Sequence, residues 1–281
     1  MNRISVFAII FTLFIPLGSY AQYASSSKTP KKAGDLIEST SYNDHKRGAP
    51  RMLQYLPSGE EFVCVNGKNR YTRALYGEHT AWRLETGDRP IFATYVKNDC
   101  RNIRFRLHLP DGTVTPLEET DWCEARYNPG TRTYALKDKA WGENCSLKVS
   151  VLASLTEEMA VWELSGELPA GCELEVLNSP IRRKKLSRSG DMGADPPGCF
   201  EPAEDGTVLQ TLKCRFPADG HLYVGISGNE LKEMRDGGVQ YLALQKACRE
   251  LAGRIRITTP DPYFNTLGGA LAVLSLIHIS E

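Results

Sequence analysis

The stretch IRFRLHL, residues 103–109, decides the fold because its side chains alternate strictly between apolar and polar. Every second residue is apolar, and the residues between them are two arginines and a histidine. A period of two predicts a strand with one buried face and one face in water. The stretch LKVSV, residues 147–151, repeats this pattern. The fold class that it indicates is mainly β, built from antiparallel sheets.

Similar short runs, separated by turn-forming residues such as Asn66-Gly67 and Pro129-Gly130, continue along most of the chain. We expect strands at residues 61–65, 81–85, 91–97, 103–109, 132–137, 147–155, 159–165, 174–178, 207–213, 221–227 and 254–258. Antiparallel sheets stacked face to face are the architecture that this spacing predicts. We place this β-sandwich domain at residues 51–238.

Two helices follow the strands in the sequence. In VQYLALQKACRELAG, residues 239–253, apolar residues recur at helical spacing, and a glycine ends the run. We interpret residues 239–260 as a linking helix and its connector. Asp261 can cap the start of a second helix, and Pro262 suits its first turn. We interpret residues 261–273 as the beginning of a helical domain.

The N-terminus has the features of a secretory signal peptide. Residues 1–21 carry Arg3, then an apolar run, then a small-residue exit, which predicts cleavage after Ala21. A membrane anchor is the weaker alternative, because the apolar run is shorter than the roughly 20 residues that a bilayer needs. Residues 22–50 have no apolar period and predict a flexible leader. The expected location is therefore periplasmic or secreted, with no stable membrane insertion after cleavage.

The charge and cysteine content of the chain argue against nucleic acid and metal ions as partners. The chain has 34 basic and 34 acidic residues and a formal net charge of zero, so no long-range field attracts nucleic acid. A neutral or weakly charged partner is expected. The 8 cysteines are well separated in sequence, which is untypical of metal sites. They are either small buried apolar groups or the source of one or two disulfides, and the sequence does not choose between these.

Motifs for catalysis or cofactor binding are not found in this sequence. It contains no glycine-rich phosphate loop and no nucleophile elbow, and its 5 histidines have no metal-ligand spacing. We therefore expect no cofactor and nominate no catalytic residue. The four tryptophans could stack on sugars, but filling the sandwich core is their expected use.

The segment SRSGDMGADPPG, residues 187–198, is neither helix nor regular strand by composition. It predicts a projecting loop in which Asp191 and Asp195 bind substrate. Its carboxylates would accept hydrogen bonds from sugar hydroxyls or coordinate a calcium ion. The alternative is an ordinary turn, because aspartate and glycine are common turn residues.

Several long segments together resemble a family of large exported proteins from Gram-negative, glycan-degrading bacteria that is known only as a domain of unknown function. The matching segments begin at LQYLPSGEEFVCVNGKNRYTRALYGEHTAWRLETGDRPIFATYV and end at AGRIRITTPDPYFNTLGGALAV, with CEARYNPGTRTYAL and KKLSRSGDMGADP between them. Family-like positions in the first segment are Asn69, Arg73, Leu75, Tyr76, Gly77, Gly87 and Asp88, for which we expect structural roles. Family-like positions in the loop are Ser187, Arg188, Gly190, Asp191, Gly193, Ala194 and Asp195, and the resemblance makes Arg188, Asp191 and Asp195 the candidates for binding substrate.

The resemblance implies a β-supersandwich of the galactose-mutarotase type, preceding an (α/α)6 toroid of the six-hairpin glycosidase type. It also implies that the segment at 261–273 is the first helix of that toroid. Residues 274–281, LSLIHISE, depart from the family and resemble an artefactual tail.

The function that the resemblance implies is polysaccharide degradation, as the N-terminal sandwich fragment of a glycoside-hydrolase-like protein that is inactive alone. Its expected partners are a polysaccharide or oligosaccharide and the missing C-terminal helical domain. The alternatives are a non-catalytic carbohydrate-binding module and a structural or partner-docking domain.

Overall fold

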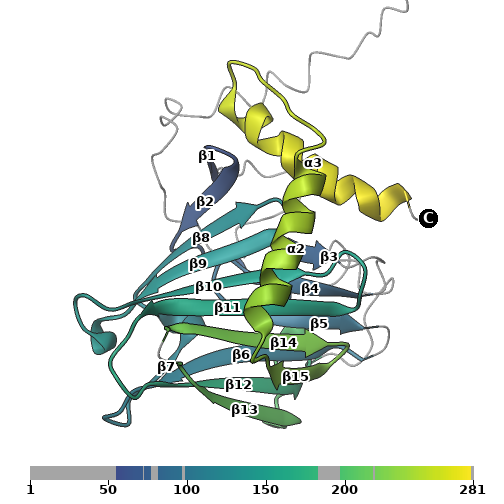
Figure 1. The fold of residues 1–281 in the computed structure, drawn as a ribbon. Helices are drawn as coiled ribbons and strands as arrows, with labels where there is room; N and C mark the ends of the chain where they lie inside the picture. The colour runs from purple at the N-terminus through teal and green to yellow at the C-terminus, as the bar shows by residue number, and fades with distance from the viewer. Residues whose placement is uncertain are drawn as a thin grey trace, which may run out of the picture.

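The computed structural model describes residues 55–71, 73–76, 82–96, 99–182, 197–217 and 219–279. They form two antiparallel sheets packed face to face, followed by two helices (Figure 1). The predicted mainly β fold with antiparallel sheets is confirmed.

Sheet A, counted over the described residues, has eight strands. Their order is β1 (Leu56–Ser58), β2 (Glu61–Val65), β8 (Trp122–Asn128), β9 (Thr131–Lys137), β10 (Ser146–Ala153), β11 (Met159–Glu167), β14 (His221–Ser227) and β15 (Glu230–Glu233). Sheet B has seven strands by the same count. Six of them run in the order β13 (Gln210–Arg215), β12 (Glu173–Pro180), β6 (Arg101–His108), β5 (Phe92–Val96), β4 (Trp82–Thr86) and β3 (Arg73–Tyr76), and β7 (Val114–Pro116) pairs with β6. The 3-10 helices η2 (Leu117–Glu119), η3 (Lys139–Trp141) and η5 (Pro197–Phe200) lie in the connections.

The core lies between the sheets and follows the alternation seen in the sequence. The apolar residues of β6 are fully buried, and they face those of β10 and β11 in one hydrophobic cluster. Trp162 is central to this cluster, with ring centroids 5.3 Å from Phe92 and 5.5 Å from Phe105. Trp82 and Trp141 are also buried. The expected use of these three tryptophans as core residues is confirmed.

Both predicted helices are present. Helix α2 (Gly237–Ala252) lies across the outer face of sheet A, against β10, β11 and β14 (Figure 1). Its Tyr241 hydroxyl donates a hydrogen bond of 2.7 Å to Ser150. Helix α3 (Pro262–Ile279) packs against α2 and β1. The Asp261 carboxylate accepts a hydrogen bond from the backbone of Tyr263 at 2.8 Å, as expected of a helix cap. None of the described helices is long and apolar enough to cross a membrane.

One predicted strand is wrong. Residues 254–258, RIRIT, lie between the helices without strand structure, although their sequence alternates. Most of these residues are exposed, and Ile255 is 39% exposed. They pass away from the sheets, and a strand forms only where a neighbouring strand can satisfy its backbone groups. All eight cysteines are thiols in the structure, and six of them are buried.

A buried ion pair joins the two sheets. Arg132 on β9 and Asp88, which follows β4, are both 0% exposed, with charged atoms 3.7 Å apart. The guanidinium of Arg132 also donates to the backbone oxygen of Gly87 at 3.0 Å and to the hydroxyl of Tyr55. Burial opposes the charged form, but Tyr55, Tyr134 and Asp88 outweigh it and raise the pKa of Arg132. Arg132 therefore remains charged inside the sandwich.

Asp88 also fixes the segment that precedes β3. Its second carboxylate oxygen accepts hydrogen bonds from the backbone nitrogen and the side-chain amide of Asn69, at 2.9 and 2.8 Å. The structural roles expected of Asn69, Gly87 and Asp88 are thus confirmed, and Leu75 is buried in the core. The side chains of Arg73 and Tyr76, and all of Gly77, lie outside the described residues.

Replacing Asp88 by Asn should destabilise the protein strongly. The variant leaves the Arg132 charge buried without its counter-ion, and we expect the free energy of unfolding to fall by about 3–5 kcal/mol. Urea unfolding followed by tryptophan fluorescence measures this loss. The control is Arg126→Gln, because Arg126 is partly exposed where it pairs with Glu61 at 2.9 Å, and exposed pairs contribute about 0–1 kcal/mol. Equal, small losses in both variants would contradict a structural role for the buried pair.

Candidate functional site

The predicted substrate-binding residues Arg188, Asp191 and Asp195 fall within residues 183–196, which lie outside the described residues. The two ends of that segment are described, and they are joined to each other. Ile181 and Pro202 form an antiparallel bridge, and the backbone nitrogen of Arg182 donates to the backbone oxygen of Glu201 at 2.6 Å. The described residues that flank this segment are therefore held together, and we call them the loop base; they and their neighbours form the candidate site.

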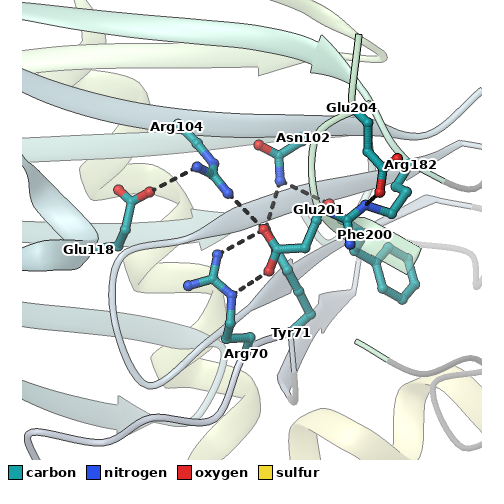
Figure 2. Close-up of polar contacts among 9 residues, drawn as sticks. All are labelled: Arg70, Tyr71, Asn102, Arg104, Glu118, Arg182, Phe200, Glu201 and Glu204. Atoms are coloured by element: carbon teal, nitrogen blue, oxygen red, sulfur yellow. Dashed lines mark hydrogen bonds and ion pairs between the residues drawn. The ribbon is translucent and has the colours of Figure 1, made fainter. Parts of the chain in front are cut away.

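Glu201 is the centre of this site (Figure 2). Its carboxylate accepts two hydrogen bonds from Arg70, one from Nε and one from Nη2 at 2.9 Å. Arg104 on β6 donates a further bond of 2.7 Å. The Glu201 side chain is only 14% exposed, so these bonds are shielded from water. Bidentate arginine–carboxylate pairs fix both distance and orientation, so Glu201 holds the loop base firmly against sheet B.

A second set of contacts also holds the loop base against sheet B. Asn102 on β6 donates to the hydroxyl of Tyr71 at 2.7 Å and to the backbone oxygen of Phe200 at 2.8 Å. The rings of Tyr71 and Phe200 lie 5.8 Å apart and pack with Ile91 and Ala93 in a small buried cluster. Burial and the charge of Glu201 raise the pKa of Tyr71 to about 12. Tyr71 therefore acts here as a neutral hydrogen-bonding group.

Arg104 links Glu201 to a second carboxylate. Its Nη1 lies 3.5 Å from Glu118 Oε1, and Glu118 is buried, which raises the pKa of its carboxyl group. Two arginines, Arg70 and Arg104, thus balance two glutamates. Within the described residues, Arg104 Nε, Glu118 Oε2 and Asn102 Oδ1 are buried atoms without a hydrogen-bond partner. The formal charges of the cluster therefore cancel, and three of its buried polar atoms can still form hydrogen bonds.

The same outer face of sheet B continues as rows of alternating charge. Glu175 on β12 lies 3.1 Å from His108, 3.6 Å from Arg106 and 3.8 Å from Lys213 on the neighbouring strands. The strand register places a positive residue on each side of this glutamate. A face of this kind is hydrophilic but has little net field, so it suits a neutral hydroxylated ligand better than a strongly charged one.

Glu85 is a buried carboxyl group elsewhere on the outer face of sheet B. It lies on β4, is 0% exposed, and accepts a hydrogen bond from Arg83 at 2.5 Å. The Arg83 guanidinium lies 4.0 Å from the ring centroid of Tyr95. Burial raises the pKa of Glu85 to about 7, although Arg83 works in the opposite direction. Glu85 therefore changes its charge near neutral pH.

The described residues contain no group of three or more His, Cys, Asp or Glu that could hold a metal ion. The calcium site suggested for the loop lies outside these residues and stays a prediction. Sequence reasoning also missed the members of the cluster, because Arg70 and Glu201 are 131 residues apart. Their positions in the sequence could have indicated them, because Arg70 follows the family-like Asn69 and Glu201 lies shortly after the predicted loop.

Glu201→Gln should loosen the loop base. The variant removes the charge that holds Arg70 and Arg104, and we expect unfolding free energy to fall by about 2–3 kcal/mol. Amide hydrogen exchange of Arg182, whose nitrogen donates to the Glu201 backbone oxygen, should become faster. The control is Glu204→Gln, which removes a solvent-exposed pair with Arg182 and should leave this exchange unchanged. Unaltered exchange in both variants would show that the ion pairs do not fix the loop base.

Glu85 predicts a specific pH dependence of stability. Its pKa in the folded protein is about 7 and in the unfolded chain about 4.3, so the folded state binds the extra proton between these values. Stability should therefore be full below the lower value and decline as pH rises to about 7, by roughly 2–4 kcal/mol.

Glu85→Gln should remove this part of the decline in a series of urea unfolding curves between pH 4 and 8. The control Glu157→Gln, at an exposed turn position, should keep the wild-type slope. A Glu85→Gln slope equal to that of the wild type would contradict the assignment.

Comparison with known proteins finds a family model that is similar to part of this chain. No curated protein matches the chain. Residues 100–211, which run from the start of β6 into β13 and include Asn102, Arg104, Glu118 and Glu201, match a family described as a domain of unknown function (DUF4450). The matched region lies within the mainly antiparallel β-sheet domain and contains most of the candidate site.

Proposed function

We propose that this chain is the β-sandwich part of a glycoside-hydrolase-like protein that degrades polysaccharide, and that it supports rather than performs the chemistry. In this role the sandwich presents the loop at 183–196 to a glycan and carries a helical domain on its C-terminal helices. The observation that carries the proposal is the apolar surface of α3.

Helix α3 has an apolar surface on the side away from the sandwich. Ala270 and Ala272 are buried, whereas Phe264, Leu267 and Leu271 are 58%, 36% and 48% exposed. These three residues recur at intervals of three and four, so they form one ridge along the helix. A helix that is apolar on both sides is typical of a position between two layers. The partner that fits this ridge is another amphipathic helix, which supports the expected helical domain.

The carboxylates of the candidate site support a non-catalytic role. Glycoside hydrolysis uses two carboxyl groups with distinct protonation, one as acid and one as base or nucleophile. Glu201 is bound by Arg70 and Arg104, and Glu118 shares Arg104. Carboxylates held in this way serve as anchors. In the proposed protein the catalytic carboxylates are therefore supplied by the helical domain.

The alternative of an independent carbohydrate-binding module receives less support. Such modules present flat aromatic side chains to sugars, and Trp82, Trp141 and Trp162 are all in the core. Trp122 is partly exposed, but Lys137 lies 5.6 Å from its ring centroid. Loop residues 183–196 contain no aromatic residue. The polar face of sheet B and the loop remain the surface proposed to meet the glycan.

A comparison of two proteins tests the proposal. Sequencing chromosomal DNA across the codon for Val273 should reveal a reading frame that continues into a helical domain. Both the longer protein and the 281-residue chain are then assayed for release of reducing ends from a panel of polysaccharides. We expect release by the longer protein alone.

Substitutions in the apolar ridge of α3 should disrupt the contact between the sandwich and the helical domain of the longer protein. Leu267→Asp combined with Leu271→Asp should lower turnover, because charged residues cannot remain in an apolar helix contact. The control is Val208→Asp, which changes an exposed apolar residue outside the helices and should have no effect. Sugar release by the 281-residue chain would refute the proposal. A Kd tighter than about 1 mM for that chain, without turnover by either protein, would favour the binding module.

A further inference from the structure

Cys145 and Cys172 approach the same end of the sandwich from opposite sheets. Cys145 directly precedes β10 of sheet A, and Cys172 directly precedes β12 of sheet B. On both strands the second residue after the cysteine, Leu147 or Leu174, is buried in the core. Because side chains on one face recur at every second position, both thiols point into the space between the sheets.

The local structure keeps the two cysteines near each other. The pairing of β10 with β11 ends at Ser146 and Glu167, and the chain then reaches Cys172 in sheet B within residues 168–172. So short a connection brings the sheets together at this end. Cys172 belongs to the main hydrophobic cluster, and Cys145 packs against that cluster. Burial raises the pKa of the Cys172 thiol, and the neighbouring Cys145 adds to this rise.

Each cysteine is also held by a tight turn. The backbone nitrogen of Cys145 donates to Gly142 at 3.1 Å, and that of Cys172 donates to Pro169 at 3.3 Å. Gly142 and Gly171 have φ values of 110° and 87°, a region that glycine adopts without strain. The turns thus direct both chains inward at fixed positions. A disulfide requires Cα atoms about 4.4–6.8 Å apart, so its formation tests how closely the two sheets approach at this end.

We propose that Cys145 and Cys172 form a disulfide that links sheet A to sheet B when the folded protein meets a small disulfide oxidant. Cys145 is partly exposed and Cys172 is buried. The Cys145 thiolate attacks one sulfur of oxidised glutathione and releases one glutathione thiolate. The Cys172 thiolate then attacks the Cys145 sulfur of the mixed disulfide and releases the second glutathione. Two protein thiols are oxidised to one disulfide, one oxidised glutathione is reduced to two glutathione thiols, and the two protons of the protein thiols pass to the two glutathione thiolates.

The other cysteines are less suited to this reaction. Cys64 and Cys123 are both 0% exposed, so an oxidant has no access to them. Cys100 is partly exposed, but it lies beside β6 of sheet B, where Asp99 and Arg83 are its charged neighbours. Cys100 is therefore a matched control for an accessible thiol outside the proposed pair. The proposal depends on the positions of the thiols and is independent of the proposed glycan function.

Peptide mapping tests the link directly. Reduced, folded protein is incubated with oxidised glutathione, quenched with N-ethylmaleimide in acid and digested without reduction. Mass spectrometry should find the Cys145 and Cys172 peptides joined. Closing the loop between them should raise the Tm of the oxidised protein by about 5–10 °C, and dithiothreitol should reverse this rise.

Three variants separate the steps of the reaction. Cys172→Ser should stop at a glutathione adduct on Cys145, and Cys145→Ser should leave Cys172 as a thiol. Cys100→Ser should form the link as the wild type does. Recovery of wild-type Cys145 and Cys172 as thiols or separate adducts, or of either one joined to a different cysteine, would overturn the proposal.

Discussion

Arg132 and Asp88 meet where the two sheets face each other, with no solvent to screen either charge. Burying two such groups costs several kcal/mol for each ion, and their attraction offsets this only when further hydrogen bonds complete the arrangement. Tyr55 and Asn69 supply those bonds to Asp88. The same bonds fix the segment that contains Arg70, the residue that binds Glu201 at the surface. The position of the loop base therefore depends on an interaction inside the sandwich.

The sequence predicts those parts of the fold in which local pattern and tertiary environment agree. Residues 103–109 alternate and form a strand because neighbours on both sides complete its hydrogen bonds. Residues 254–258 alternate as regularly, but none of the described strands pairs with them. Conversely, WCEARYN at 122–128 has a weak pattern and still forms a strand, since β2 and β9 flank it. Whether residues 254–258 and 122–128 form strands was decided by the presence of a partner strand, which the sequence pattern of the segment itself does not reveal.

The candidate site could be predicted only in part, for a related reason. Glycine and aspartate content predicts a loop at 187–198, most of which lies outside the described residues, because those residue types disfavour regular structure. It does not identify what holds that loop. Arg70, Arg104 and Glu201 come from three distant segments, and each resembles an ordinary surface charge in the sequence. The packing of Tyr71 against Phe200 and the hydrogen bonds of Asn102 to both residues bring these segments together.

The two faces of the sandwich differ in a way that bears on the proposed function. Helix α2 occupies the outer face of sheet A and carries α3, so the apolar ridge is reached from that side. The outer face of sheet B carries neutral rows of charge and the base of the loop. Arg132 and Glu201 are linked through one short segment, because Asp88 binds both Arg132 and Asn69, and the adjacent Arg70 binds Glu201. A helical domain bound to α3 would therefore leave the loop face open, and a glycan held there would meet a support whose position is set by the interior.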